Sequence, residues 1–199
     1  MTPRPKNKTV KRTVSKDHQL IKRHTWTAPD ALDADGMLDG QLVTAVSLTF
    51  TTFIAQPDFA RTLSLIPKTN TTDVPAGDVT INGTDINDEV ISDVLTFAAN
   101  ASTAQNTVKA FKTVTSIVFP TPDGDTATWD LGTLDALGLS ERIQEDSILH
   151  TLVDGTVEST RPTVVSSTVN KNLCTIDCDT ALNGSKDVVC YYTYPFPTV

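Results

Sequence analysis

Few residues in this chain have side chains suited to acid–base catalysis. The sequence contains three histidines, His18, His24 and His150, and a general base needs a positioned nucleophile and an orienting partner. His150 alternates with Leu149 and Leu152 in an expected strand, a pattern typical of a surface or hydrogen-bonded histidine. The G-x-S-x-G elbow, a phosphate-binding glycine loop and the H-E-x-x-H zinc motif are missing. We therefore predict that the chain is not an enzyme and holds no cofactor.

The three cysteines, Cys174, Cys178 and Cys190, include no C-x-x-C pair and lie far in sequence from every histidine, which argues against a zinc site. If residues 174–178 are extended, their two thiols lie about 13 Å apart on one face. The Cα atoms of a disulfide approach to about 4.4–6.8 Å. We predict three free thiols, buried or half-buried, and leave open a bridge from Cys190 to one of the others.

The segment 33–36 (DADG) partly matches a calcium-binding loop. The EF-hand spacing needs ligands at positions 31, 33 and 35 and a glutamate at position 42. The chain has Ala31 and Leu42 at two of these positions. We therefore predict a solvated turn and no metal site.

Charge is divided unevenly along the 199 residues. Residues 1–24 carry eight basic side chains and one acidic one, a net charge of +7, whereas the rest carries eight basic and 23 acidic ones, a net charge of −15. Prolines and scattered apolar residues disfavour local structure over residues 1–27. We expect an extended arm that contacts protein and whose Trp26 docks against its own body or a neighbour. Its contact residues are Arg4, Lys6, Lys8, Lys11, Arg12, Lys16, Lys22, Arg23 and Trp26.

The arm and an acidic, glycine-punctuated linker are expected to occupy residues 1–41, and the body residues 42–199, with a further boundary near residue 145 as an option. The sequence has no run of 18 apolar residues that would span a membrane. No apolar stretch follows the basic residues as it does in a signal peptide. We expect a product made inside the cell that joins a larger assembly.

Alternation with a period of two residues predicts β-strands along most of the body. The clearest case is residues 90–97, where Ile91, Asp93, Leu95 and Phe97 share one face. Residues 132–139 are expected to form a helical turn or a tight loop. Strands are also predicted at 42–54, 61–66, 78–81, 108–119, 126–131, 148–153, 156–160, 163–169, 173–177 and 187–194.

The turns between these strands carry their own signals. Asp154-Gly155 and Asn183-Gly184 are typical of type I′ hairpins, in which both central residues need a positive φ. Pro195 follows the last strand and favours an edge or terminal position for it. Many short strands separated by such turns predict an all-β fold, an antiparallel β-sandwich or barrel-like body with an extended basic N-terminal arm.

A basic arm can bind nucleic acid by neutralising phosphates. Here it lacks interleaved aromatic residues apart from Trp26, and the acidic body repels nucleic acid. We therefore prefer an acidic protein surface as the partner of the arm, either another protein or a neighbouring copy of the chain.

The string VTINGTDINDEVISDVLTF, followed by KAFKTVTSIVFP, GTLDALGL and LHTLVDGTVEST, resembles small structural proteins of tailed-bacteriophage virions, the head decoration and minor capsid proteins. The resemblance covers about residues 61–194 and consists of turn and packing signatures, so it transfers no functional residue. Asp88 stands where similar sequences tend to have glycine, and aspartate tolerates the positive φ of that turn. The resemblance implies a β-sandwich-like body seated on a capsid lattice.

The expected function is that of a capsid decoration (cement) protein on the outer surface of a phage head. Its expected partners are the major capsid protein and neighbouring copies, for example in a homotrimer, with no membrane and no nucleic acid. One alternative is a tail, baseplate or fibre component of the same virion. Others are a carbohydrate- or host-surface-binding module, which the few aromatic residues disfavour, and a nucleic-acid packaging protein.

Overall fold

The computed structural model describes residues 19–45 and 48–195. Its regular structure consists of antiparallel β-strands and three short 3-10 helices, η1 (Thr71–Asp73), η2 (Glu145–Ser147) and η3 (Lys171–Leu173). The predicted all-β antiparallel fold is confirmed. The strands are β1 (Gln19–Trp26), β2 (Asp33–Leu42), β3 (Thr49–Phe50), β4 (Arg61–Thr69), β5 (Gly77–Thr84), β6 (Val90–Phe97), β7 (Gln105–Asn106), β8 (Thr113–Val118), β9 (Thr128–Gly138), β10 (Ile148–Val153), β11 (Thr156–Val157), β12 (Thr163–Val165), β13 (Thr175–Asp177) and β14 (Val188–Pro195).

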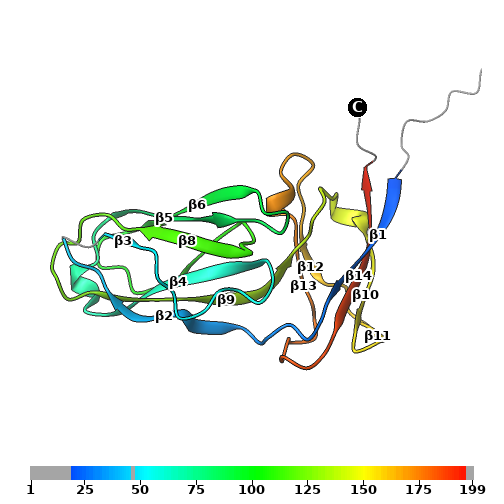
Figure 1. Ribbon diagram of the computed structural model, residues 1–199, viewed down its shortest axis with the longest axis horizontal. Helices are drawn as coiled ribbons and strands as arrows, with labels where there is room; N and C mark the ends of the chain where they lie inside the picture. Colours follow the sequence, from blue (N-terminus) through cyan, green and yellow to red (C-terminus); the bar gives the residue numbers. More distant parts are fainter. Residues whose placement is uncertain (1–18, 46–47, 196–199) are drawn as a thin grey trace, which may run out of the picture.

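The strands form three sheets (Figure 1). The terminal sheet has the order β1-β14-β10-β11, and the central sheet has the order β12-β13-β9-β4-β7, with β2 also paired to β9. The third sheet, β3-β8-β5-β6, covers one end of the central sheet to make a β-sandwich. The terminal sheet stands at the opposite end of the elongated molecule.

Strand β9 connects the two ends of the molecule. Trp129 and Leu131, in its first half, lie in the sandwich core. Leu137, near its end, lies in a second core beneath the terminal sheet. One edge of β9 pairs with β4, while the other pairs first with β2 and then with β13. The division between the two cores therefore falls inside one continuous strand, between residues 131 and 137.

The prediction of a turn at residues 132–139 is wrong, because β9 runs through Gly138. The glycines that suggested a turn serve close packing instead. A Cβ atom on Gly132 would lie 1.8 Å from the backbone oxygen of Asp33, and one on Gly138 would lie 2.7 Å from the Cβ of Ala110. Glycine in a strand often marks such close backbone approach.

The expectation of an arm and linker with little structure of their own is wrong for residues 19–26 and 33–41, which belong to strands β1 and β2. Strand β1 pairs with β14 along its whole length, from Gln19 opposite Pro195 to Trp26 opposite Val188. Strand β2 pairs with β9, so the expected solvated turn at 33–36 is part of a bulged strand. The sequence carries no signal for β1, because its inward side consists of Leu20, Lys22, His24 and Trp26 while Ile21 faces outward, so apolar and polar residues do not alternate.

Other strand boundaries differ from expectation. One strand is predicted over residues 42–54, which are described apart from 46–47. In the structure β2 ends at Leu42, and the short strand β3 (Thr49–Phe50) is the one that follows it within this range. The last strand, β14, is central rather than at an edge, because β1 covers the side that Pro195 seemed to close. Asn183 does not take a positive φ, so that turn is not type I′, whereas Asp154 and Gly155 do, as predicted. Asp88 also has the expected positive φ, 63°.

A buried arginine lies where the two cores meet. Arg61, the first residue of β4, is 0% exposed and pairs through its backbone with Phe111 and with Leu137 of β9. Its Nε lies 2.7 Å from one carboxylate oxygen of Asp58, and its Nη2 donates to the other oxygen at 2.8 Å. Nη2 also donates to the backbone oxygen of Asp30 at 2.6 Å. The guanidinium therefore links the segment before β2 (Asp30) to the segment before β4 (Asp58). It does so beside Leu137, in the part of β9 that enters the second core.

Replacing this guanidinium should be costly. We expect Arg61→Met to lower the free energy of unfolding by about 3–5 kcal/mol, because the Asp58 carboxylate loses its counter-charge and the backbone oxygen of Asp30 loses its donor. Arg61→Met combined with Asp58→Leu should recover much of the loss. Urea unfolding followed by circular dichroism measures both, with the exposed Arg23→Met as the control. A single variant within about 1 kcal/mol of wild type would contradict a structural role for the pair.

Candidate functional site

Of the nine residues predicted to contact a partner, three lie in the described part of the chain and six do not. Arg4, Lys6, Lys8, Lys11, Arg12 and Lys16 lie outside the described residues. The described chain starts at Gln19, on the edge strand β1 and opposite Pro195, so residues 1–18 are joined to one end of the terminal sheet. The other three predicted residues, Lys22, Arg23 and Trp26, are all on β1.

Two of these three residues are engaged within their own body. The Lys22 ammonium donates to Ser140 Oγ at 2.8 Å and lies 2.7 Å from the Glu141 carboxylate. Trp26 is 0% exposed in the core beneath the terminal sheet, so it is an internal anchor of β1. Arg23, on the opposite face of the strand, is exposed.

His24 lies between Lys22 and Trp26 on the inward side of β1. Its ring centroid is 4.3 Å from that of Trp26, and its register partner is the buried Cys190. Burial, and secondarily the nearby Lys22 charge, lowers the pKa of His24 below 6.5. The inward side of β1 therefore favours the neutral imidazole.

His150, the histidine of the body, is exposed on β10 and stacks on Tyr191 of β14. The ring centroids are 4.8 Å apart with an interplanar angle of 30°. This arrangement agrees with the predicted surface histidine. The stack joins two strands that are adjacent in the sheet but distant in sequence, so the sequence alone did not reveal it.

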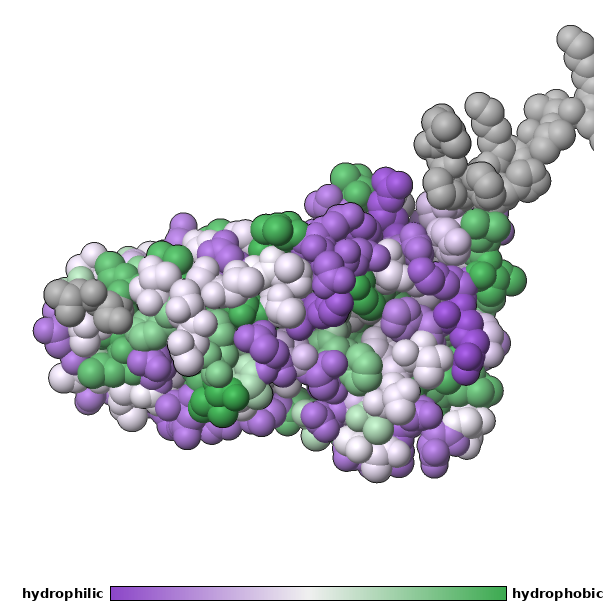
Figure 2. All heavy atoms as spheres, in the orientation of Figure 1, coloured by the Kyte–Doolittle hydropathy of each residue, from purple (hydrophilic) through white to green (hydrophobic). Residues whose placement is uncertain are grey.

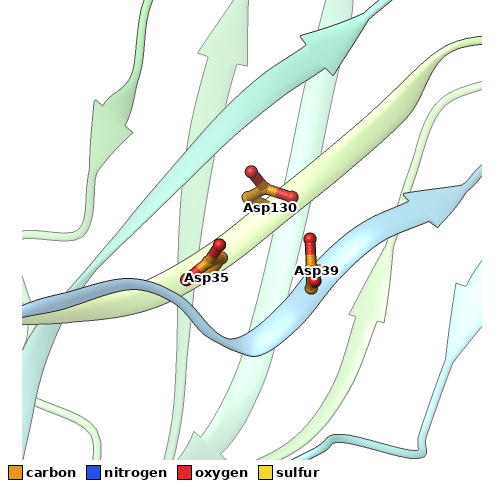
Figure 3. Close-up of side chains that lie close together, drawn as sticks. All are labelled: Asp35, Asp39 and Asp130. Atoms are coloured by element: carbon orange, nitrogen blue, oxygen red, sulfur yellow. The ribbon is translucent and has the colours of Figure 1, made fainter.

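An acidic cluster on the central sheet is a second candidate site (Figure 3). Asp35 and Asp39 on β2 and Asp130 on β9 bring carboxylate oxygens within 4.8 Å of one another. It is the one grouping of three acidic, histidine or cysteine side chains with metal-ligand spacing among the described residues. Asp35 belongs to segment 33–36, which the sequence marks as a partial match to a calcium loop. Asp130 could not be predicted as its neighbour, because it comes from β9, the strand paired with β2.

Lys68 already supplies a positive charge to this cluster. Its Nζ lies 2.5 Å from Asp39 Oδ1 and 3.2 Å from Asp130 Oδ2. The other oxygen of Asp130 accepts the backbone N–H of Gly40 at 2.6 Å. The pKa of Asp35 is raised chiefly by its hydrogen bond with Asp33, with smaller contributions from desolvation and the neighbouring negative charges. Asp39 and Asp130 thus already have partners on the surface of the sheet, namely the Lys68 ammonium and the backbone N–H of Gly40.

The cysteines are placed as predicted. Cys174, Cys178 and Cys190 are free, with the first and last buried and Cys178 half-buried. Burial raises the pKa of Cys190 to about 12 and also raises the pKa of Cys174 and Cys178. Thiols that stay protonated are weak nucleophiles and weak metal ligands.

The described part of the chain is strongly acidic. It carries ten basic and 23 acidic residues, and six of those carboxylates form salt bridges with described residues. The other carboxylates include Asp33, Asp135 and Asp177, and the pKa of Asp177 is raised by desolvation and then by the charges of Asp135 and Glu158. Negative charge therefore accumulates on this body without internal compensation.

No helix among the described residues is long and apolar enough to cross a membrane. Comparison of the chain with protein-family models, curated proteins and solved structures finds no match.

His24 should make the attachment of β1 sensitive to acid. Because the pKa is lowered in the folded state, the unfolded chain binds a proton more readily, so the stability contributed by neutral His24 is lost as pH falls through about 6.5. We expect thermal unfolding temperatures to fall from pH 7.5 to 5.5 by less in His24→Gln than in wild type. His150→Gln, at an exposed position, is the control. Parallel pH curves for wild type and His24→Gln would contradict this effect.

The acidic cluster should respond differently at its two β2 positions. Asp35→Asn should leave the unfolding temperature unchanged or raise it at pH 7, since a raised pKa means that the charged carboxylate is disfavoured in the folded state. Asp39→Asn should lower it slightly, because the partly exposed pair with Lys68 contributes on the order of 1 kcal/mol or less. Calorimetry at low and high salt measures both. A larger loss in Asp35→Asn than in Asp39→Asn would refute this assignment.

Proposed function

We propose that this chain is a structural, non-catalytic virion protein that decorates the outer surface of a phage head and stabilises it through contacts between subunits. The major capsid protein, or a neighbouring copy on the same lattice, is the acidic partner of residues 1–18. The proposal combines the resemblance of the central motifs with the physical properties of the arm and body.

The observation that carries the proposal is the opposition of charge between two parts of one chain. Residues 1–18 hold six basic residues and one acidic one, whereas the described body has 13 more acidic than basic residues. The segment leaves from Gln19, which is held in a fully paired strand. A basic tether fixed to a rigid acidic body suits a lattice, where each copy offers the next an oppositely charged surface.

The composition of the body supports an adhesive role. The described residues bring together one cluster with metal-ligand spacing, and Lys68 already pairs with two of its three carboxylates. Eighteen residues in extended form reach at most about 60 Å, which is long compared with a small domain. Such a segment spans neighbouring subunits without rearrangement of the body.

The arm is tested by neutralisation within the full-length chain. We expect replacement of Arg4, Lys6, Lys8, Lys11, Arg12 and Lys16 by serine to weaken binding to heads assembled without this chain by about tenfold or more. Each exposed ion pair contributes about 0.2–1 kcal/mol. The residual binding should depend less on salt, because exposed charges are screened. Co-sedimentation at low and physiological salt measures the affinity.

The matched control neutralises Arg142 and Lys186, which make no salt bridge with described residues of the body. Equal binding of the arm variant and wild type at physiological salt would remove the role of the arm. Failure of wild type to bind heads would reject decoration itself. Copy number then separates the head from the tail, with on the order of hundreds of copies on a head lattice and about six or twelve in a tail ring.

A further inference from the structure

The outward face of the terminal sheet is uncovered by the described residues. Residues directly opposite each other in paired strands point to the same side of a sheet, so the register defines this face. Its inward neighbours Trp26, Val188, Cys190 and Tyr192 fill the core beneath. We call its outward residues the terminal face: Ile21, Arg23, Thr25, His150, Leu152, Val157, Val189, Tyr191 and Thr193.

The terminal face is organised in rows across the strands. One row runs over all four strands through Thr25, Val189, Leu152 and Val157, in which each residue is the register partner of the next. The neighbouring row holds Arg23, Tyr191 and His150, with the aromatic stack at its centre.

Part of this face is apolar and exposed. Ile21 is 66% exposed and Val157 56%, and Val189 and Leu152 are half-buried. Figure 2 shows separate hydrophobic patches at the margin formed by the terminal sheet, with hydrophilic atoms between them. Isolated exposed apolar side chains are common, whereas a group of them on one sheet face suggests a contact surface.

The charge of the terminal face contrasts with that of the body. None of its nine residues is acidic, although the described chain has 23 acidic residues, and Arg23 provides its permanent charge. Residues 1–18, with six further basic residues, begin beside it at Gln19. The apolar residues and Arg23 thus lie on the sheet whose strand β1 is joined to residues 1–18.

We infer that the terminal face is the surface through which the body seats on its partner, and that this partner is a protein surface with an apolar centre and carboxylates around it. The inference rests on the proposed function and adds the orientation of the body: the terminal sheet faces the partner and the β-sandwich points away. Arg23 lies opposite a partner carboxylate, and Tyr191 with the row of Val189, Leu152 and Val157 fills the apolar centre.

Charge complementarity selects this partner over the alternatives. Face-to-face packing of two copies would bring two copies of Arg23 to one interface with no carboxylate on either terminal face. Nucleic acid would satisfy the basic residues but would leave the four-strand apolar row unused. An apolar surface bordered by carboxylates satisfies both features.

Substitutions on the terminal face test this in the full-length chain. Ile21→Glu with Val157→Glu should weaken binding to heads assembled without the chain by at least tenfold, because the new charges meet carboxylates across an apolar contact. Ile21→Lys with Val157→Lys should lose less. Arg23→Glu is an independent variant at a position without a salt bridge among described residues. The matched control is Val90→Glu with Val94→Glu on β6, which are 88% and 52% exposed.

Unfolding temperatures of the free variants establish that each one is folded. Selective loss of binding in the terminal-face variants, with the β6 control within twofold of wild type, supports the inference. Wild-type binding by the terminal-face variants, or equal loss in the control, overturns it and leaves decoration standing. Absence of wild-type binding overturns both. Binding to linear double-stranded DNA that Arg23→Glu abolishes, with head binding unchanged, assigns the face to nucleic acid and also overturns the inference.

Discussion

The arrangement of this molecule depends on one buried guanidinium. Moving a charged group out of water costs several kcal/mol unless a partner and hydrogen bonds compensate for it. Arg61 obtains both from Asp58 and from the backbone oxygen of Asp30, which belong to the segments that lead into β4 and β2. The charge is therefore satisfied only when these segments are in place against β9. A polar requirement of this kind specifies one register at the joint between the cores, where apolar packing alone would permit sliding.

Strand β9 makes the two cores mechanically and thermodynamically dependent on each other. Because it contributes Trp129 to one core and Leu137 to the other, neither core is complete without the same eleven residues. Trp26, from the start of the described chain, completes the second core. The paired strands β1 and β14 consequently pack on Leu137 from the middle of the chain, and this packing supports the terminal sheet.

Local patterns predicted the fold class and several elements, since alternation and Asp-Gly turns report on neighbours in sequence. The buried face of β6 and the positive φ of Asp88 follow from such patterns. These patterns gave wrong predictions where a strand distant in sequence determines the structure. Gly132 allows the close approach of β2, and β1 forms because it pairs with β14. Arg61 and Asp130 have no sequence signal, because their partners come from other segments. The phage resemblance and the role of residues 1–18 stay predictions, since no comparison or described residue bears on them.

The pairing of Gln19 with Pro195 has a consequence for how the molecule carries load. When force pulls two antiparallel neighbours apart from the same end, their hydrogen bonds break one after another, whereas sliding the strands lengthwise would load all of them at once. Tension applied between the two ends of the described chain therefore unzips β1 from β14 stepwise. Strand β1 would then be released while Arg61 and β9 still hold the sandwich together.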